Sequence, residues 1–124
     1  MKVVGLDHIA LNVADPRRAL EFYAGELGLE PVRVEEWERG EVLFPSVRVD
    51  ESTVIDLLKV ERSGENVNHL CLVLEAGTDL DALAASGRFE VVDGPDDRWG
   101  ARGVARALLY VRDPDGNVVE LRSY

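Results

Sequence analysis

An internal repeat constrains the fold of this 124-residue chain more than any other feature. Each half opens on a stretch in which apolar and polar side chains alternate, Leu6–Val13 in the first half and Asn68–Leu74 in the second. Such alternation is typical of a strand with one buried face. Helical spacing follows each strand, and three or so shorter strands follow the helix. The pattern therefore predicts one unit, strand, helix and three strands, written twice.

The repeat also predicts the domain organisation. A polar link, Glu61–Asn66, separates module 1–60 from module 66–124. A chain of this length can bury one sizeable core but is too short for two independent domains. We therefore expect a single domain, 1–124, of the α+β class, built from two tandem βαβββ modules.

Capping residues predict where the helices begin and end. Asp15 followed by Pro16 starts the first helix, which Gly28 ends, and Thr78 starts the second, which ends at Gly87. The shorter strands are expected near Val32–Trp37, Glu41–Phe44, Val47–Val49, Thr53–Val60, Phe89–Val92, Ala105–Val111 and Val118–Tyr124, with a hairpin turn at Asp113–Asn117 between the last two.

Charge and composition exclude several classes of partner. The formal net charge of −10 gives a field that repels nucleic acid phosphates and anionic membranes. The sequence has no apolar run long enough for a membrane span and no apolar segment typical of a signal peptide near its start. Its one cysteine, Cys71, cannot form an intramolecular disulfide. We therefore expect a cytoplasmic protein with neither nucleic acid nor membrane as partner.

Four ionisable residues occupy corresponding places in the two copies. His8 and His69 each lie in the opening strand of a half, opposite its aliphatic face. Asp56 and Glu120 each lie in the closing strand of a half. If the two halves pack side by side, these four side chains converge. Nitrogen and carboxylate ligands suit a divalent ion such as Zn, Ni, Co, Mn or Fe(II), and four of them leave open positions for water or substrate.

Each of these residues also has a plainer interpretation. A lone strand histidine is more often structural than a ligand. Asp56 is equally suited to a solvated strand, and Glu120 to a charge pair with Arg122 or Arg112 across the sheet. Repetition of the pattern, rather than any single residue, favours the metal site.

The chain resembles the vicinal oxygen chelate superfamily over essentially its whole length. The resemblance rests on Leu6–Val13, on the helix from Asp15 to Leu29, and on Tyr110–Leu121, whose D-P-D-G-N-x-x-E-L segment is the most specific part. That superfamily includes glyoxalase I, extradiol dioxygenases, methylmalonyl-CoA epimerase and bleomycin-resistance proteins. The resemblance implies strands that curve into a half-barrel cup, with the helices outside.

The resemblance also implies roles for particular residues. The family's metal triad falls on His8, His69 and Glu120, and Glu120 occupies the position of the base in glyoxalase-like proton transfer. The fourth ligand of glyoxalase I is usually a Glu, whereas Asp56, one methylene shorter, stands there in this chain. Asp56 is therefore expected either to bind the metal directly or to orient a bound water.

The segment Gly94–Gly103 and its surroundings suggest a substrate-binding loop. Arg98, Arg102 and nearby Arg106 could bind a carboxylate or phosphate, with Trp99 as a lid or stacking surface. The alternative is a solvated loop whose arginines pair with local acids.

Three functions remain open from the sequence. The first is a glyoxalase I type enzyme that uses a divalent metal to act on a small molecule with two adjacent oxygens, for which the arginines suggest an anionic substrate. The second is an Fe(II) extradiol-type dioxygenase. The third is a metal-free, drug-binding protein of the bleomycin-resistance kind, which would not need metal ligands. We expect a homodimer in each case, because a single module of about 60 residues buries too little surface alone.

Overall fold

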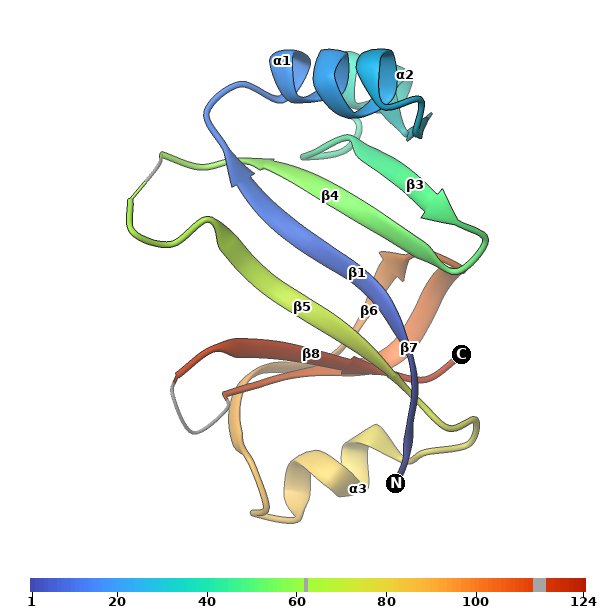
Figure 1. Ribbon diagram of the computed structural model, residues 1–124. Coiled ribbons are helices and arrows are strands. Elements are labelled where there is room, and N and C mark those ends of the chain that lie inside the picture. The colour runs from blue at the N-terminus through green and yellow to red at the C-terminus, as the bar shows by residue number, and fades with distance from the viewer. Residues whose placement is uncertain (62, 113–115) are drawn as a thin grey trace. The chain divides into compact units, whose positions relative to one another are not determined.

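The first strand, β1 (Val3–Val13), contributes to two compact units of the chain (Figure 1). The computed structural model describes residues 1–61, 63–112 and 116–124, apart from the side chain of Arg106. Unit 1 consists of Met1–His8 with His69–Tyr124, and unit 2 consists of Ile9–Asn68. Unit 1 is thus assembled from the two ends of the sequence.

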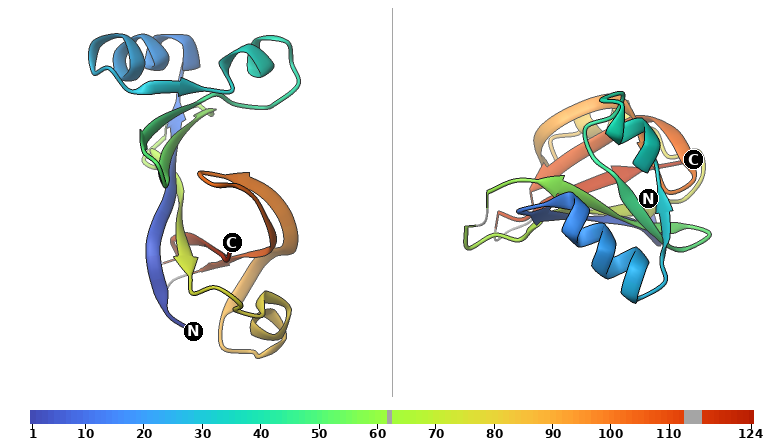
Figure 2. Two further views of the ribbon diagram at one scale, coloured as in Figure 1. Left: turned by 90° about the vertical axis from the view of Figure 1, so that its right-hand side faces the viewer. Right: turned by 90° about the horizontal axis from the view of Figure 1, so that it is seen from above.

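Unit 1 is a mixed sheet with one helix. In addition to the start of β1, its elements are β5 (Val67–Leu74, from His69 on), α3 (Leu80–Ala85), β6 (Glu90–Gly100), β7 (Gly103–Arg112) and β8 (Val118–Arg122). The strand order is β1-β5-β8-β7-β6. Strand β5 is parallel to β8, whereas β7 is antiparallel to both β8 and β6. The β6–β7 ribbon is strongly curved (Figure 2).

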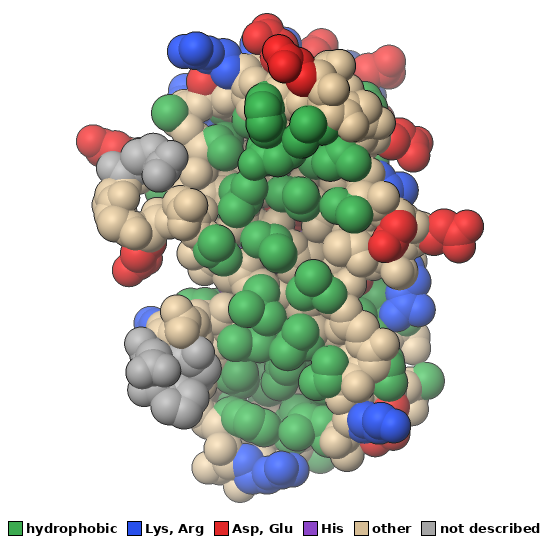
Figure 3. Space-filling view, viewed as in Figure 1, with side chains coloured by type: hydrophobic (Ala, Val, Ile, Leu, Met, Phe, Trp, Pro, Cys, Tyr) green, Lys and Arg blue, Asp and Glu red, His purple; other side chains and the backbone are tan. Residues whose placement is uncertain are grey.

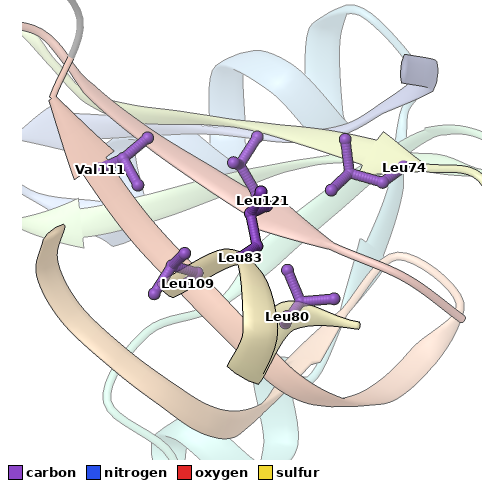
Figure 4. Close-up of a cluster of buried hydrophobic side chains, with 6 residues drawn as sticks. All are labelled: Leu74, Leu80, Leu83, Leu109, Val111 and Leu121. Carbon is purple, nitrogen blue, oxygen red and sulfur yellow. The ribbon is translucent and has the colours of Figure 1, made fainter. Parts of the chain in front are cut away.

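Strand register separates the two faces of this sheet. Cys71, Glu120 and Tyr110 are paired neighbours on β5, β8 and β7, so they share one face. Leu72, Leu121 and Leu109 are paired in the same way on the opposite face. Helix α3 covers this apolar face: Leu80 and Leu83 point toward the strands in Figure 4. The buried members of this cluster are Leu74, Leu80, Leu83, Leu109, Val111 and Leu121.

Unit 2 contains the rest of the first module. Its elements are the end of β1, α1 (Pro16–Leu20), a π-helix η1 (Glu21–Glu26), β2 (Glu30–Val32), α2 (Val34–Glu38), β3 (Ser46–Asp50) and β4 (Thr53–Lys59). The strand order in this unit is β2-β3-β4-β1, and β3 is antiparallel to both β2 and β4.

The predicted fold class is confirmed. The elements run β1, α1, β2, β3, β4 and then β5, α3, β6, β7, β8, which is the βαβββ order twice, with η1 and α2 as additions. Asp15 caps α1 by accepting a hydrogen bond from the Arg17 amide at 3.0 Å, as the sequence predicts. The second helix begins one residue later than predicted, because Asp79 rather than Thr78 accepts the capping bond, from the Ala82 amide.

Three segments differ from the sequence prediction. Glu41–Phe44, expected as a strand, lies in the irregular connection between α2 and β3. Val34–Glu38 is helical rather than part of a strand, because Arg33 has a left-handed backbone (φ 62°) that ends β2, and the glutamates of the first turn suit a helix N-terminus. Gly94–Gly100 belongs to a long strand, β6, rather than to a loop. Residues 113–115 of the predicted turn Asp113–Asn117 lie outside the described residues. No helix in the described part of the chain is long and apolar enough to cross a membrane.

Removing part of the apolar cluster should destabilise the chain. Leu109 is 0% exposed, so Leu109→Ala removes buried methyl groups and leaves a cavity. We expect the free energy of unfolding to fall by about 2–5 kcal/mol, measured by urea denaturation. Leu43→Ala is the matched control, because Leu43 is 91% exposed and its truncation should change stability by less than about 0.5 kcal/mol. Equal losses in the two variants would contradict this description of the core.

Candidate metal centre

Three of the four predicted ligands meet in unit 1. His8 Nε2 lies 3.0 Å from His69 Nε2 and 3.0 Å from Glu120 Oε2, and His69 Nε2 lies 3.2 Å from the same oxygen. His8 comes from β1, His69 from the start of β5 and Glu120 from β8. Residues at the two ends of the sequence therefore converge on one point, as the repeat predicts.

This triangle fits a bound divalent ion. Two ligand atoms at right angles around an ion, with bonds of about 2.1 Å, are about 3.0 Å apart, whereas tetrahedral ligands would be about 3.4 Å apart. Two sides of the triangle match the first spacing, and the third, at 3.2 Å, lies between the two spacings. Glu120 Oε2 is buried and accepts no well-aligned hydrogen bond from the described residues, so an unsatisfied acceptor points at the centre. The three side chains would hold the ion and leave other positions open for water or substrate.

His8 is oriented by Asp7, which precedes it on β1. His8 Nδ1 lies 2.7 Å from Asp7 Oδ2, so the ring presents Nε2 to the triangle. Asp7 in turn accepts hydrogen bonds from the Tyr124 hydroxyl at 2.5 Å and from the Ala101 amide at 3.0 Å. Asp7 is 0% exposed and His8 2% exposed. This carboxylate and histidine arrangement is the one that typically supports a metal-binding imidazole.

Buried charge shifts the pKa values of these groups. Burial acts to raise the pKa of Glu120, but His69, His8 and Arg122 outweigh it and hold that pKa well below its usual range. Burial acts to lower the pKa of His8, but the contacts with Asp7, Cys71 and Glu120 raise it to about 12. The pKa of Asp7 is lowered, because its hydrogen bonds outweigh its burial. The site therefore strongly favours the ionised carboxylates.

Asp56 lies in unit 2, where its carboxylate accepts a hydrogen bond from the Ser46 hydroxyl at 2.5 Å. Asp56 is 4% exposed, so the interpretation as a solvated strand residue is wrong. Its role as fourth ligand or as a residue that orients water stays a prediction.

The predicted substrate-binding residues lie on the β6–β7 hairpin. The Arg102 guanidinium stacks over the Tyr124 ring at 4.3 Å, and the Trp99 carbonyl accepts a hydrogen bond from Arg122. Trp99 pairs with Val104 in regular antiparallel register, so the segment is a hairpin and not the flexible loop expected from its glycines. The Arg106 side chain lies outside the described residues. Substrate binding by these residues stays a prediction.

Arg98 adjoins the candidate centre through Tyr110. Its guanidinium lies 5.9 Å from the centroid of the Tyr110 ring, and that ring packs edge to face against His69 with centroids 5.3 Å apart. Arg98 also binds the carboxylates of Asp93 and Asp96, at 3.3 and 3.1 Å. The pairing with local acids, which the sequence left open, is thus present.

Sequence reasoning missed the supporting role of Asp7, Tyr110 and Tyr124. Arg122 was considered as a partner of Glu120, and the structure shows that pair. Arg112 instead contacts Glu90 and the Gly116 carbonyl. Strand alternation did not predict a contact between Asp7 and His8, because neighbouring residues of a strand normally point to opposite faces. In the structure, both side chains are buried.

Comparison with known proteins places this geometry in context. A family model described as the Glyoxalase/Bleomycin resistance protein/Dioxygenase superfamily matches residues 5–121. The chain is 27% identical to virulence protein STM3117 of Salmonella typhimurium over 122 residues, which is 96% of this chain and 83% of that protein. It is 29% identical to the glyoxalase domain-containing protein RDO1 of Mycosarcoma maydis over 136 residues, which is 100% of this chain and 70% of that protein.

Solved structures share the fold. A methylmalonyl-CoA epimerase variant from Streptomyces coelicolor has a TM-score of 0.70 at 24% identity and covers 98% of both chains. The 2,3-dioxygenase LapB from Pseudomonas sp. KL28 has a TM-score of 0.68 at 18% identity, with 98% of this chain and 43% of that chain covered.

Burial should make the single thiol unreactive. Cys71 is 0% exposed, and burial raises the pKa of its thiol to about 11. The thiolate, which is the reactive form, is therefore scarce at pH 8. We expect an aromatic disulfide reagent to label Cys71 far more slowly in buffer than in denaturant, followed by absorbance. Labelling of the native protein at the rate of a free cysteine would contradict this placement.

Proposed function

Because this chain belongs to the Glyoxalase/Bleomycin resistance protein/Dioxygenase superfamily, we propose that it is a divalent-metal-dependent enzyme acting on a small molecule with two adjacent oxygens. The observation that carries the proposal is the triangle formed by His8, His69 and Glu120. A metal-free drug-binding protein would have no use for three ligand atoms at this spacing.

Each residue of the triangle and its neighbours has a proposed role. His8 Nε2, His69 Nε2 and Glu120 Oε2 would hold the ion, and Asp7 would keep His8 in its binding orientation. A bound divalent ion would supply Lewis acidity, polarising an oxygen of the substrate and acidifying a proton next to a carbonyl. Tyr110 lines the same face, and its pKa is raised by burial and by Glu120, so its hydroxyl stays protonated and acts as a hydrogen-bond donor toward Glu120.

We infer that the reaction is a proton transfer of the glyoxalase I type. Such a reaction needs a metal, a substrate with adjacent oxygens and an anion-binding group for its remaining part. Arg98 is the arginine of the β6–β7 hairpin that contacts Tyr110 beside His69, which supports an anionic substrate. Arg102 and Arg106 stay candidates for the same role, with Trp99.

Ring cleavage by Fe(II) is the second candidate. Two histidines and one carboxylate on one face of the ion form the ligand set typical of non-haem Fe(II) oxygenases. The same three side chains meet in this structure. The two candidates differ in the metal and the substrate that they require, so one set of measurements separates them.

Metal content tests the proposal directly. The protein purified without chelators should contain about one divalent ion per chain, and His69→Ala should lose most of it because the remaining ligands are poorly compensated. Leu70→Ala is the matched control, since the next residue on β5 points to the opposite face. Elemental analysis measures both. Full metal occupancy in His69→Ala would refute the assignment.

A substrate panel then separates the reactions. Hemithioacetals of α-oxo aldehydes test the proton transfer, and catechols with oxygen test ring cleavage by the iron-loaded protein. Turnover of the first group supports the leading proposal. Turnover of catechols alone would replace it with the second.

We also propose a homodimer. Val3 and Val4 of β1 are exposed, and Figure 3 shows hydrophobic side chains gathered over the strands on the viewed face of unit 1. Exposed apolar surface of this kind supports self-association. Light scattering at micromolar concentration should give about twice the chain mass of 13.7 kDa. A mass equal to that of one chain would exclude the dimer.

A further inference from the structure

The two oxygens of Glu120 have different surroundings. Glu120 and Arg122 are two residues apart on β8, so their side chains share one face. Oε1 accepts a hydrogen bond from Arg122 Nε at 3.0 Å and a second from Arg122 Nη2. Oε2 accepts no well-aligned hydrogen bond from the described residues and faces the two histidines. Arg122 thus donates two hydrogen bonds to Oε1 of Glu120 and leaves Oε2 facing the candidate metal centre.

Arg122 is itself held rigidly. Its side chain is 0% exposed, and five hydrogen bonds leave from its three nitrogens. Nη2 also donates to the Trp99 carbonyl at 3.2 Å, and Nη1 to the Tyr124 hydroxyl at 3.2 Å and the Arg98 carbonyl at 3.5 Å. A guanidinium whose donors are all engaged in a buried site has little freedom to release Glu120.

The backbone is shaped around this guanidinium. Gly100 ends β6 directly beside Arg122, and a Cβ at that position would lie 1.8 Å from Arg122 Nη1 and 2.5 Å from the Tyr124 hydroxyl oxygen. Such distances are far below van der Waals contact, so any side chain at position 100 must displace the guanidinium. Gly100 therefore provides independent support for a site built to hold Arg122 in this place.

We propose that Arg122 is a positioning residue that reserves Oε2 of Glu120 for the metal and keeps Glu120 a fixed ligand bound through one oxygen. This inference rests on the proposed metal function. It departs from the sequence expectation that Glu120 acts as the base, because a carboxylate that moved to take up a proton would break two buried hydrogen bonds to Arg122.

Cobalt binding to the full chain tests the proposal without any assay of activity. Co(II) is titrated into the metal-free protein and followed by its visible absorption, which reports ligand number and geometry. We expect Arg122→Met to bind Co(II) about 10–100-fold more weakly and with altered band positions, because Glu120 can then rotate or bind through both oxygens. Arg122→Lys, which keeps the charge but lacks the fork of donors, should fall between.

A rescue experiment separates positioning from general destabilisation. Added guanidinium ion should restore the parental spectrum and affinity to Arg122→Ala, because it fits the vacated space beside Glu120. Arg88→Met is the control, since Arg88 lies over Phe89 elsewhere in unit 1 and should leave both readouts unchanged. Gly100→Ala keeps the charge of Arg122 but displaces its guanidinium, and it should reproduce the spectral change even if the Arg122 variants fail to fold.

The outcomes distinguish the two proposals. If the parental protein takes up no Co(II), the proposed metal function fails and this inference fails with it. If the parental protein binds Co(II) and a folded Arg122→Met or Gly100→Ala variant binds it with the parental affinity and spectrum, only the positioning role of Arg122 is overturned.

Discussion

Asp7, His8, Glu120 and Arg122 place four ionisable side chains in the interior of unit 1, each 2% exposed or less, and the unit depends on their mutual compensation. An isolated charge in such a place would cost several kcal/mol, so each must find an opposite charge or a set of donors. Arg122 balances one of the two carboxylates. The second negative charge needs a further positive one, either a proton on His8, whose pKa is raised to about 12, or a bound cation. If the site binds a metal as proposed, uptake of the ion would release that proton.

Much of the candidate centre could be predicted because it follows from strand periodicity. In the strands that carry His69 and Glu120, polar and apolar residues alternate as a half-buried strand requires. Duplication of the unit then predicts that His8 lies beside them. Asp56 could be recognised in the same way, but its partner Ser46 could not, since that pairing depends on the register of β3 with β4. Register across strands is set by turns and packing, which a single sequence does not display.

The residues that hold the centre in place were harder to find. Asp7 adjoins its histidine in sequence, yet alternation places neighbours on opposite faces and so hides their contact. The full length of strand β6 could not be predicted for a related reason. Its register with β7 shifts at several points. Gly94 has a φ of 91°, and a Cβ at this position would lie 2.6 Å from the Leu108 carbonyl oxygen. In the sequence, such a glycine indicates a loop. A bulge or a glycine with positive φ inside a strand has the same residue types as a turn, so the sequence predicts that the strand ends there.

The discontinuous make-up of unit 1 also governs the order in which this chain can mature. The segment Met1–His8 is synthesised before all of unit 2, and the rest of unit 1, His69–Tyr124, is synthesised after it. Met1–His8 must therefore wait, carrying His8 and Asp7, while Ile9–Asn68 already has all of its own segments. Contacts between such distant parts of a sequence form slowly, because a long loop must close first. The candidate centre is thus among the last features of the molecule to form during translation.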